Sequence, residues 1–132
     1  MNVDRLIACA RQVIGNARYS FDRERCVGLD TVNCFTFVRE LYRCQALDVP
    51  SDLGQMLAVG QVVRQRDLKP GHCLLLTARW GGYDLSRKGL FDVGHIALYA
   101  GPTMIHASYS QATVIEEPVD WRQVRGALTF TA

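Results

Sequence analysis

The sequence lacks three features that would place a protein in a class at once. It has no Cys-x-x-Cys pair among its five cysteines, and their odd number argues against a disulfide framework. It has no long hydrophobic run, and charged residues interrupt the apolar pattern at its start, so we expect neither a signal peptide nor membrane insertion. Its formal net charge is only +2 at pH 7, with no run of lysine and arginine, so we expect no nucleic-acid partner. We therefore expect a protein that is made, and folds, in a cytoplasm.

What the sequence has is the composition of a soluble globular protein. Its 132 residues are 48% hydrophobic and 21% charged. This length predicts one domain over residues 1–132 that buries its own core. The adjacent pair His72 and Cys73 would point to opposite faces of a strand, so we predict no metal site.

The first half of the chain predicts helices. Apolar residues over 2–14 recur with the 3.6-residue period of a helix, and a Gly-Asn pair ends the pattern. A loop over 17–32 leads to a second helix over 33–46. A third, weaker helix over 52–63 contains two glycines.

The second half predicts strands. Short apolar runs separated by turn residues predict five strands, at 73–78, 94–100, 103–108, 114–119 and 126–131. A glycine-rich loop over 79–91 is long enough to shape the edge of a cleft. Helices followed by short strands predict an α+β fold, with the helices packed on one side of a small antiparallel sheet or half-barrel.

A cysteine begins the second predicted helix. Asn33 is a good N-cap, and it leaves Cys34 beside the positive end of the helix dipole, which favours thiolate over thiol. The position therefore predicts a nucleophile. Cys34 also shares the inward face of the helix with Val38 and Leu41, so a plain core residue is the alternative.

Two histidines lie on neighbouring predicted strands. If the Gly-Pro turn between these strands is a two- or four-residue connection, position 97 pairs with His106, and His106 lies diagonally from His95 on one sheet face. A three-residue connection would place the two histidine rings on opposite faces of the sheet. With the Cys34 helix packed on that face, the three side chains would form a nucleophile, a base and a group that orients the base. The backbone N–H of Cys34 would then face the oxyanion, and the alternative is that each histidine is structural.

These residues resemble the NlpC-type peptidoglycan cysteine peptidases, a papain-like family. The family pattern is Asp-Cys-Ser-Gly-Phe-Val, then a Pro-Gly-Asp turn, then His-Val-Gly-Ile-Tyr and Ile-His-Ala-Ser. The similar stretches of this sequence are 33–38, 68–72, 95–99 and 104–108. The resemblance implies that Cys34 is the nucleophile, His95 the base and His106 the third member of a triad.

The resemblance also suggests residues for substrate contact. Residues 15–19 resemble the family's Gly-x-x-Tyr, whose tyrosine lies near the cysteine, so Tyr19 is a candidate for substrate or oxyanion contact. Asn33 and Phe35 stand where the family has aspartate and serine, and we expect the bulk of Phe35 to reshape the pocket. His72 replaces the aspartate of the family's turn.

The C-terminal part, residues 104–130, resembles the version found in tailed phages and gene-transfer particles. That resemblance implies a tail-associated endopeptidase that cuts peptidoglycan peptide stems between the gamma carboxyl of D-glutamate and diaminopimelate. The reaction would pass through a thioester and need no metal or cofactor. The partners would be the stems and tail-tip or hub proteins. The place would be the virion tail tip, made in the host cytoplasm and acting in the periplasm or cell wall. The alternatives are an amidase or acyltransferase on the same scaffold, and a tail-tip structural or assembly protein with a little-used or inactive site.

Overall fold

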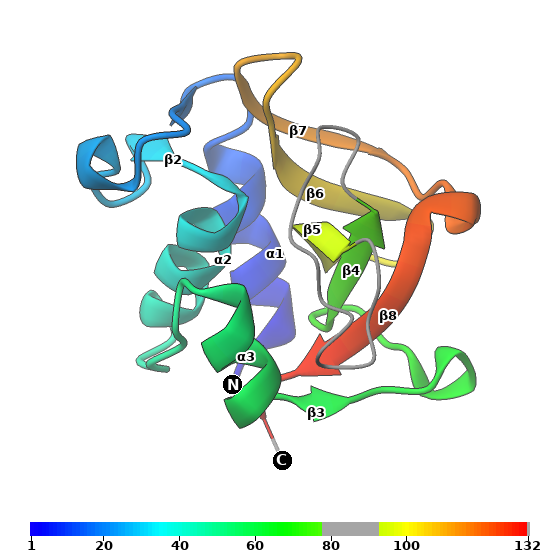
Figure 1. Ribbon diagram of the computed structural model, residues 1–132. Coiled ribbons are helices and arrows are strands. Elements are labelled where there is room, and N and C mark those ends of the chain that lie inside the picture. Colours follow the sequence, from blue (N-terminus) through cyan, green and yellow to red (C-terminus); the bar gives the residue numbers. More distant parts are fainter. Residues whose placement is uncertain (78–92, 132) are drawn as a thin grey trace.

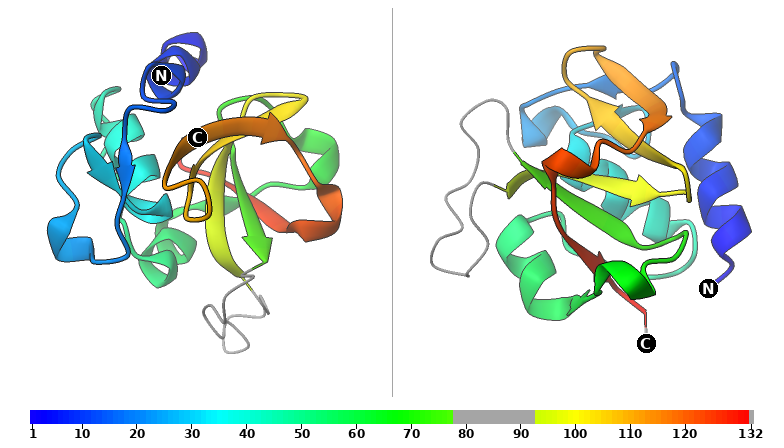
Figure 2. Two further views of the ribbon diagram at one scale, coloured as in Figure 1. Left: turned by 90° about the horizontal axis from the view of Figure 1, so that it is seen from above. Right: turned by 90° about the vertical axis from the view of Figure 1, so that its right-hand side faces the viewer.

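Helices and a curved sheet make up residues 1–77 and 93–131, which the computed structural model describes (Figure 1). The helices in this part of the chain are α1 (Val3–Gln12), α2 (Cys34–Arg43) and α3 (Leu53–Val59), with short 3-10 turns η1 (Arg23–Arg25), η2 (Gln65–Asp67) and η4 (Trp121–Gln123). The main sheet has the strand order β3-β8-β4-β5-β6-β7 and its pairs are antiparallel. Its strands are β3 (Gln61–Val62), β4 (Cys73–Thr77), β5 (Val93–Tyr99), β6 (Thr103–Ser108), β7 (Thr113–Pro118) and β8 (Val124–Thr129). Figure 2 shows α1 and α2 on one side of this sheet, which is the predicted α+β arrangement.

The ends of the helices follow from a few residues. The side chain of Asn2 accepts the N–H of Arg5 at 3.1 Å and begins α1, so the first predicted helix is confirmed. The second helix ends at Arg43, earlier than predicted, and Ala46 has a left-handed φ of 58°. The third helix is also shorter than predicted, because Gly60 ends it and the next residues join the sheet as β3.

Most strands lie where the sequence predicts them. β6 has the predicted bounds, and β5, β7 and β8 begin one or two residues earlier than predicted. The expected cleft-edge loop at 79–91 lies outside the described residues. Apolar side chains pack on both faces of the sheet. One cluster, which includes Ile96 and Ile105, lies against the helices, and a smaller one includes Ala97 and Met104.

The segment predicted as a loop at 17–32 contains two short strands. β1 (Arg18–Tyr19) pairs in parallel with β2 (Thr31–Val32), so the loop prediction is wrong at its two ends. The start of this segment runs along the free edge of β7. The N–H of Gly15 donates to Val114 at 3.1 Å, and the N–H of Tyr19 donates to Ala112 at 3.2 Å.

Within the described ranges, no helix combines the length and the apolar character needed to cross a membrane.

Candidate active site

Cys34 is the first residue of α2, and local hydrogen bonds fix this position. The Oδ1 atom of Asn33 accepts the N–H of Thr36 at 2.8 Å, and Thr36 Oγ1 accepts the N–H of Asn33 at 2.9 Å. These two bonds form a capping box, which satisfies backbone donors at the helix start. The predicted N-cap at Asn33 is therefore confirmed. Cys34 itself is only 4% exposed.

The sulfur of Cys34 meets the sheet where β5 and β6 separate. In the described part of the chain, pairing of these strands ends at Leu98 and Ile105. The N–H of Ala100 donates to the carbonyl of Thr103 in β6. Every second residue of an antiparallel strand directs its N–H toward the same neighbour, so the N–H of Ile96 also points toward β6. This N–H donates to the Cys34 sulfur. The sulfur therefore lies beside the backbone that follows His95.

The two histidines point to the sheet face that α2 does not cover. Successive side chains of a strand point to opposite faces. Ile96 and Ile105 belong to the cluster against the helices, and each histidine is next to one of them in the chain. The expectation that the Cys34 helix packs on the histidine face is therefore wrong. Cys34 meets this part of the sheet at the backbone N–H of Ile96, the residue that follows His95.

His95 and His106 are in direct contact, as the diagonal position predicts. His95 Nε2 and His106 Nδ1 are 2.7 Å apart, and the ring centroids are 4.8 Å apart with an interplanar angle of 83°. The turn that connects the two strands has Gly101 with φ of 106°, a left-handed value that glycine adopts without strain. The N–H of Ala100 donates to the carbonyl of Thr103 across this turn. The two-residue connection is therefore confirmed.

β7 contributes a polar side chain that the sequence reasoning missed. Oε2 of Glu117 lies 2.7 Å from Nε2 of His106. The register pairs His106 with Ile115, so Glu117 is its diagonal neighbour on one side, as His95 is on the other. The only signal in the sequence was a strand with two glutamates. That signal does not say which glutamate shares the histidine face, because a shift of one residue would exchange them.

Burial controls the protonation of the site. Desolvation raises the pKa of Cys34 to about 12, although the backbone N–H of Ile96 and those of the first helical turn lower it. The expectation that the helix start favours the thiolate is therefore wrong for this closed site, because desolvation outweighs the helix terminus. Burial, and then the charge of His106, lowers the pKa of His95 to about 3. Burial also lowers the pKa of His106, although the hydrogen bond and charge of Glu117 oppose this. These shifts favour the neutral thiol of Cys34 and the neutral imidazoles of His95 and His106 at neutral pH.

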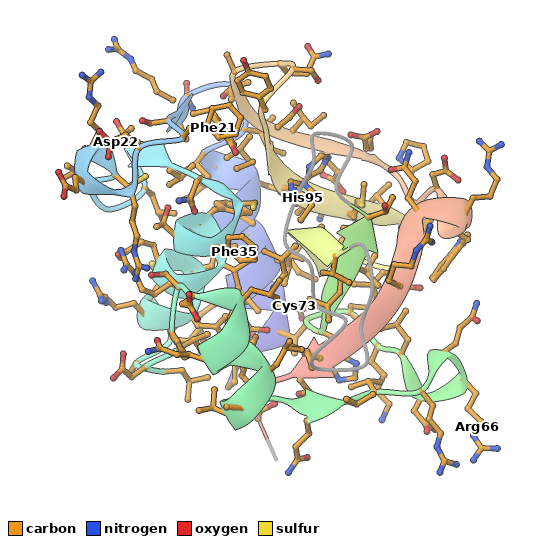
Figure 3. The ribbon with its side chains drawn as sticks, in the orientation of Figure 1. Phe21, Asp22, Phe35, Arg66, Cys73 and His95 are labelled. Carbon is orange, nitrogen blue, oxygen red and sulfur yellow. The ribbon has the colours of Figure 1, made fainter. Side chains whose placement is uncertain are left out.

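Of the three residues expected to contact substrate, Tyr19 is the best placed. Burial raises the pKa of its hydroxyl, and the nearby charge of Cys34 adds to this effect. Its ring centroid is 5.4 Å from that of Phe21, and Phe21 is 64% exposed. Figure 3 shows Phe21 next to Asp22, the N-cap residue of η1. Asn33 already uses its Oδ1 atom as an acceptor in the capping box. Phe35 is 8% exposed and belongs to the main core.

The adjacent His72 and Cys73 have separate partners. His72 Nδ1 accepts the N–H of Lys69 at 3.1 Å, and the Cys73 sulfur lies 3.5 Å from the Tyr42 hydroxyl. Over residues 1–77 and 93–131, no three side chains of histidine, cysteine, aspartate or glutamate gather so that they could hold a metal ion.

The arrangement of these elements is the papain-like NlpC/P60 fold. An NlpC/P60 family protein from Bacillus cereus ATCC 10987 is similar with a TM-score of 0.76 and 20% identity, over 100% of this chain and 41% of that protein. The NlpC/p60 domain of the peptidoglycan hydrolase SagA has a TM-score of 0.72 and 20% identity, over 98% of this chain and 99% of that domain. RipD from Mycobacterium tuberculosis, a non-catalytic NlpC/p60 domain protein with an adaptation to peptidoglycan binding, has a TM-score of 0.71 and 20% identity, over 98% and 97% of the two chains.

The comparisons of sequence found no counterpart. The chain matches no family model, and it matches no curated protein. It spans less than half the length of the Bacillus cereus protein. The similarity to solved structures therefore establishes the fold, and the activity has to be inferred from the site.

Proposed function

We propose that this chain is a cysteine endopeptidase that hydrolyses the peptide stems of peptidoglycan. The observation that carries the proposal is the 2.7 Å contact between His95 and His106, beside a helix that begins with Cys34. A nucleophile, a base and a group that orients the base are the minimum for acyl transfer by a cysteine. The substrate class is supported by the fold that this chain shares with the domain of the peptidoglycan hydrolase SagA.

His95 would carry one proton in each half of the reaction. His95 takes the proton of Cys34 as the sulfur attacks the carbonyl carbon of the stem peptide. The imidazolium then gives this proton to the leaving amine, and the acyl group stays on the sulfur as a thioester. His95 next takes a proton from water, the resulting hydroxide attacks the thioester, and the proton returns to the sulfur. The backbone N–H of Cys34 at the helix start is the proposed donor to the oxyanion.

We place the activity at the tail tip of a phage-like particle. Support comes from the resemblance of residues 104–130 to the tail-associated version of this enzyme family. In this role the protein would dock on tail-tip or hub proteins and act in the periplasm or cell wall. The expected bond joins the gamma carboxyl of D-glutamate to diaminopimelate.

A second candidate function is peptidoglycan binding or tail-tip assembly without catalysis. The closed site favours it, because Cys34 is 4% exposed and burial raises its pKa to about 12. RipD, a non-catalytic protein, has the same fold. In this case Cys34 would be a core residue.

Digestion of purified Gram-negative peptidoglycan separates these functions. Wild type, Cys34→Ala and the control Cys44→Ala are each incubated with the polymer, and released fragments are identified by mass spectrometry. Cys44 is exposed, so its substitution should leave the site intact. The proposal expects cut stems from wild type and Cys44→Ala but none from Cys34→Ala. Stems released equally by all three would contradict the nucleophile assignment. Binding to the pelleted polymer with no release by any of the three would favour the non-catalytic function.

A further inference from the structure

We propose that Glu117 is a positioning residue that fixes the tautomers of His106 and His95, so that Nδ1 of His95 is left without a proton and can act as the base. This inference rests on the proposed function for its catalytic meaning. The three side chains form one continuous row across β5, β6 and β7. The row has two contacts of 2.7 Å, one between His95 and His106 and one between His106 and Glu117.

The tautomers follow from counting protons along this row. An ionised carboxylate can only accept a hydrogen bond, so Nε2 of His106 must carry the proton that it shares with Glu117. In a neutral imidazole the other nitrogen is then an acceptor, so Nδ1 of His106 accepts from Nε2 of His95. His95 is also neutral at physiological pH, and its remaining nitrogen, Nδ1, therefore carries a lone pair and no proton. That nitrogen is the one able to take the proton of Cys34.

The carboxylate at the end of the row would also stabilise the positive charge that forms on His95 during the reaction. When His95 takes the proton from Cys34 it becomes an imidazolium, in a site where burial opposes that charge. The negative charge of Glu117 lies one residue further along the row. It already favours the protonated form of His106, against the effect of burial. Loss of the carboxylate removes this favourable charge and also the proton acceptor that sets both tautomers.

The neighbouring Glu116 offers a matched control. It lies on the same strand but faces the other side, where its carboxylate binds Arg11 at 2.9 Å and the hydroxyl of Thr103 at 2.6 Å. Substitution of Glu116 changes the same charge on the same strand without touching the histidine row. A third histidine gives an internal reference. His72 accepts a backbone N–H at Nδ1, so its Nε2 should carry the proton in every variant.

Nitrogen-15 NMR of the histidine side chains tests the inference directly. The proposal expects wild type to show the Nε2–H form of both His95 and His106. In Glu117→Ala, His95 and His106 should no longer be found only in the Nε2–H form, whereas in Glu116→Ala they should keep that form. The signals of His72 should be the same in all variants. Glu117 has a side chain that is 44% exposed, so its substitution should leave the fold intact. An Nδ1–H form of His106 in wild type, or unchanged tautomers in Glu117→Ala, would overturn the inference.

Kinetics on peptidoglycan add a second readout. Glu117→Gln should lower kcat by about ten- to a hundredfold, the usual cost of losing a group that orients a functional histidine, with little change in KM. The acid limb of its pH profile should move to lower pH, because the carboxylate no longer favours protonation of His106. Glu117→Asp should recover part of the rate. A kcat of Glu117→Gln equal to that of wild type would contradict the positioning role. If wild type cuts no stems, the proposed function fails, and the NMR result alone decides the inference.

Discussion

Replacing Asn33 by alanine should lower the free energy of unfolding by a predictable amount and make the buried Cys34 more accessible. The substitution removes the 2.8 Å bond to the N–H of Thr36 but keeps the return bond to Thr36 Oγ1. Loss of an N-cap side chain costs about 1 kcal/mol of unfolding free energy. For 132 residues the entropy of unfolding is about 280 cal/mol/K, so this loss should lower the Tm by about 4 °C.

The same change should act on the reactivity of Cys34. A loss of about 1 kcal/mol that is confined to the first turn raises the fraction of open helix ends about fivefold. Because Cys34 is 4% exposed, its alkylation by iodoacetamide requires such opening and should accelerate by a similar factor. Urea unfolding followed by circular dichroism measures the stability, and peptide mapping measures the alkylation of Cys34.

Asn2→Ala is the matched control for this experiment. Asn2 caps α1 through a comparable bond of 3.1 Å, and its loss should cost a similar amount of stability. It should leave the alkylation rate of Cys34 nearly unchanged, because α1 does not carry the cysteine. Equal acceleration in both variants would refute the local argument, since it would mean that Cys34 reacts only after global unfolding. A change below about 0.3 kcal/mol in Asn33→Ala would refute the assigned role of the capping box.

Three further outcomes are expected. In wild type at neutral pH, iodoacetamide should modify the exposed Cys44 before Cys34, because burial raises the pKa of the latter to about 12; peptide mapping that found Cys34 labelled first would contradict this. Burial lowers the pKa of His95 in the folded chain to about 3, so as the pH falls below about 6.5 the unfolded chain should take up a proton at His95 first. The free energy of unfolding should therefore decrease as the pH falls. In His95→Gln the urea midpoint should differ less between neutral pH and about pH 4 than it does in wild type. Hydrogen peroxide should link Cys9 and Cys44, whose sulfurs are 3.5 Å apart, with water as the reduced product; intact mass should fall by two hydrogen atoms, and Cys9→Ser should prevent this.

The parts of the fold that sequence could predict have local causes. The start of α2 depends on Asn33 and Thr36, which are three residues apart, and the turn between β5 and β6 depends on two residues. The parallel pair β1 and β2 had no comparable signal. Each strand is two residues long, so neither shows a period, and their pairing depends on contacts elsewhere in the fold.

In the site, too, the features with a local cause could be predicted from the sequence, and those that depend on distant contacts could not. The contact between His95 and His106 follows from a tight turn, whose length fixes the register. The contact of Glu117 with His106 depends on the register across a longer connection, and a shift of one residue there would have presented Glu116 instead. The protonation of Cys34 could not be predicted at all from the helix start. It depends on how much water the folded chain removes from the sulfur, which is a property of the whole packing.

The segment that runs along β7 has a consequence for association between molecules. A free strand edge is a template on which other chains can add strands and aggregate. Backbone groups of Gly15 and Tyr19 occupy this edge, and the hydroxyl of Thr113 donates to the carbonyl of Ala17 at 2.5 Å. These contacts therefore shield the edge of β7 from pairing with the strands of neighbouring molecules.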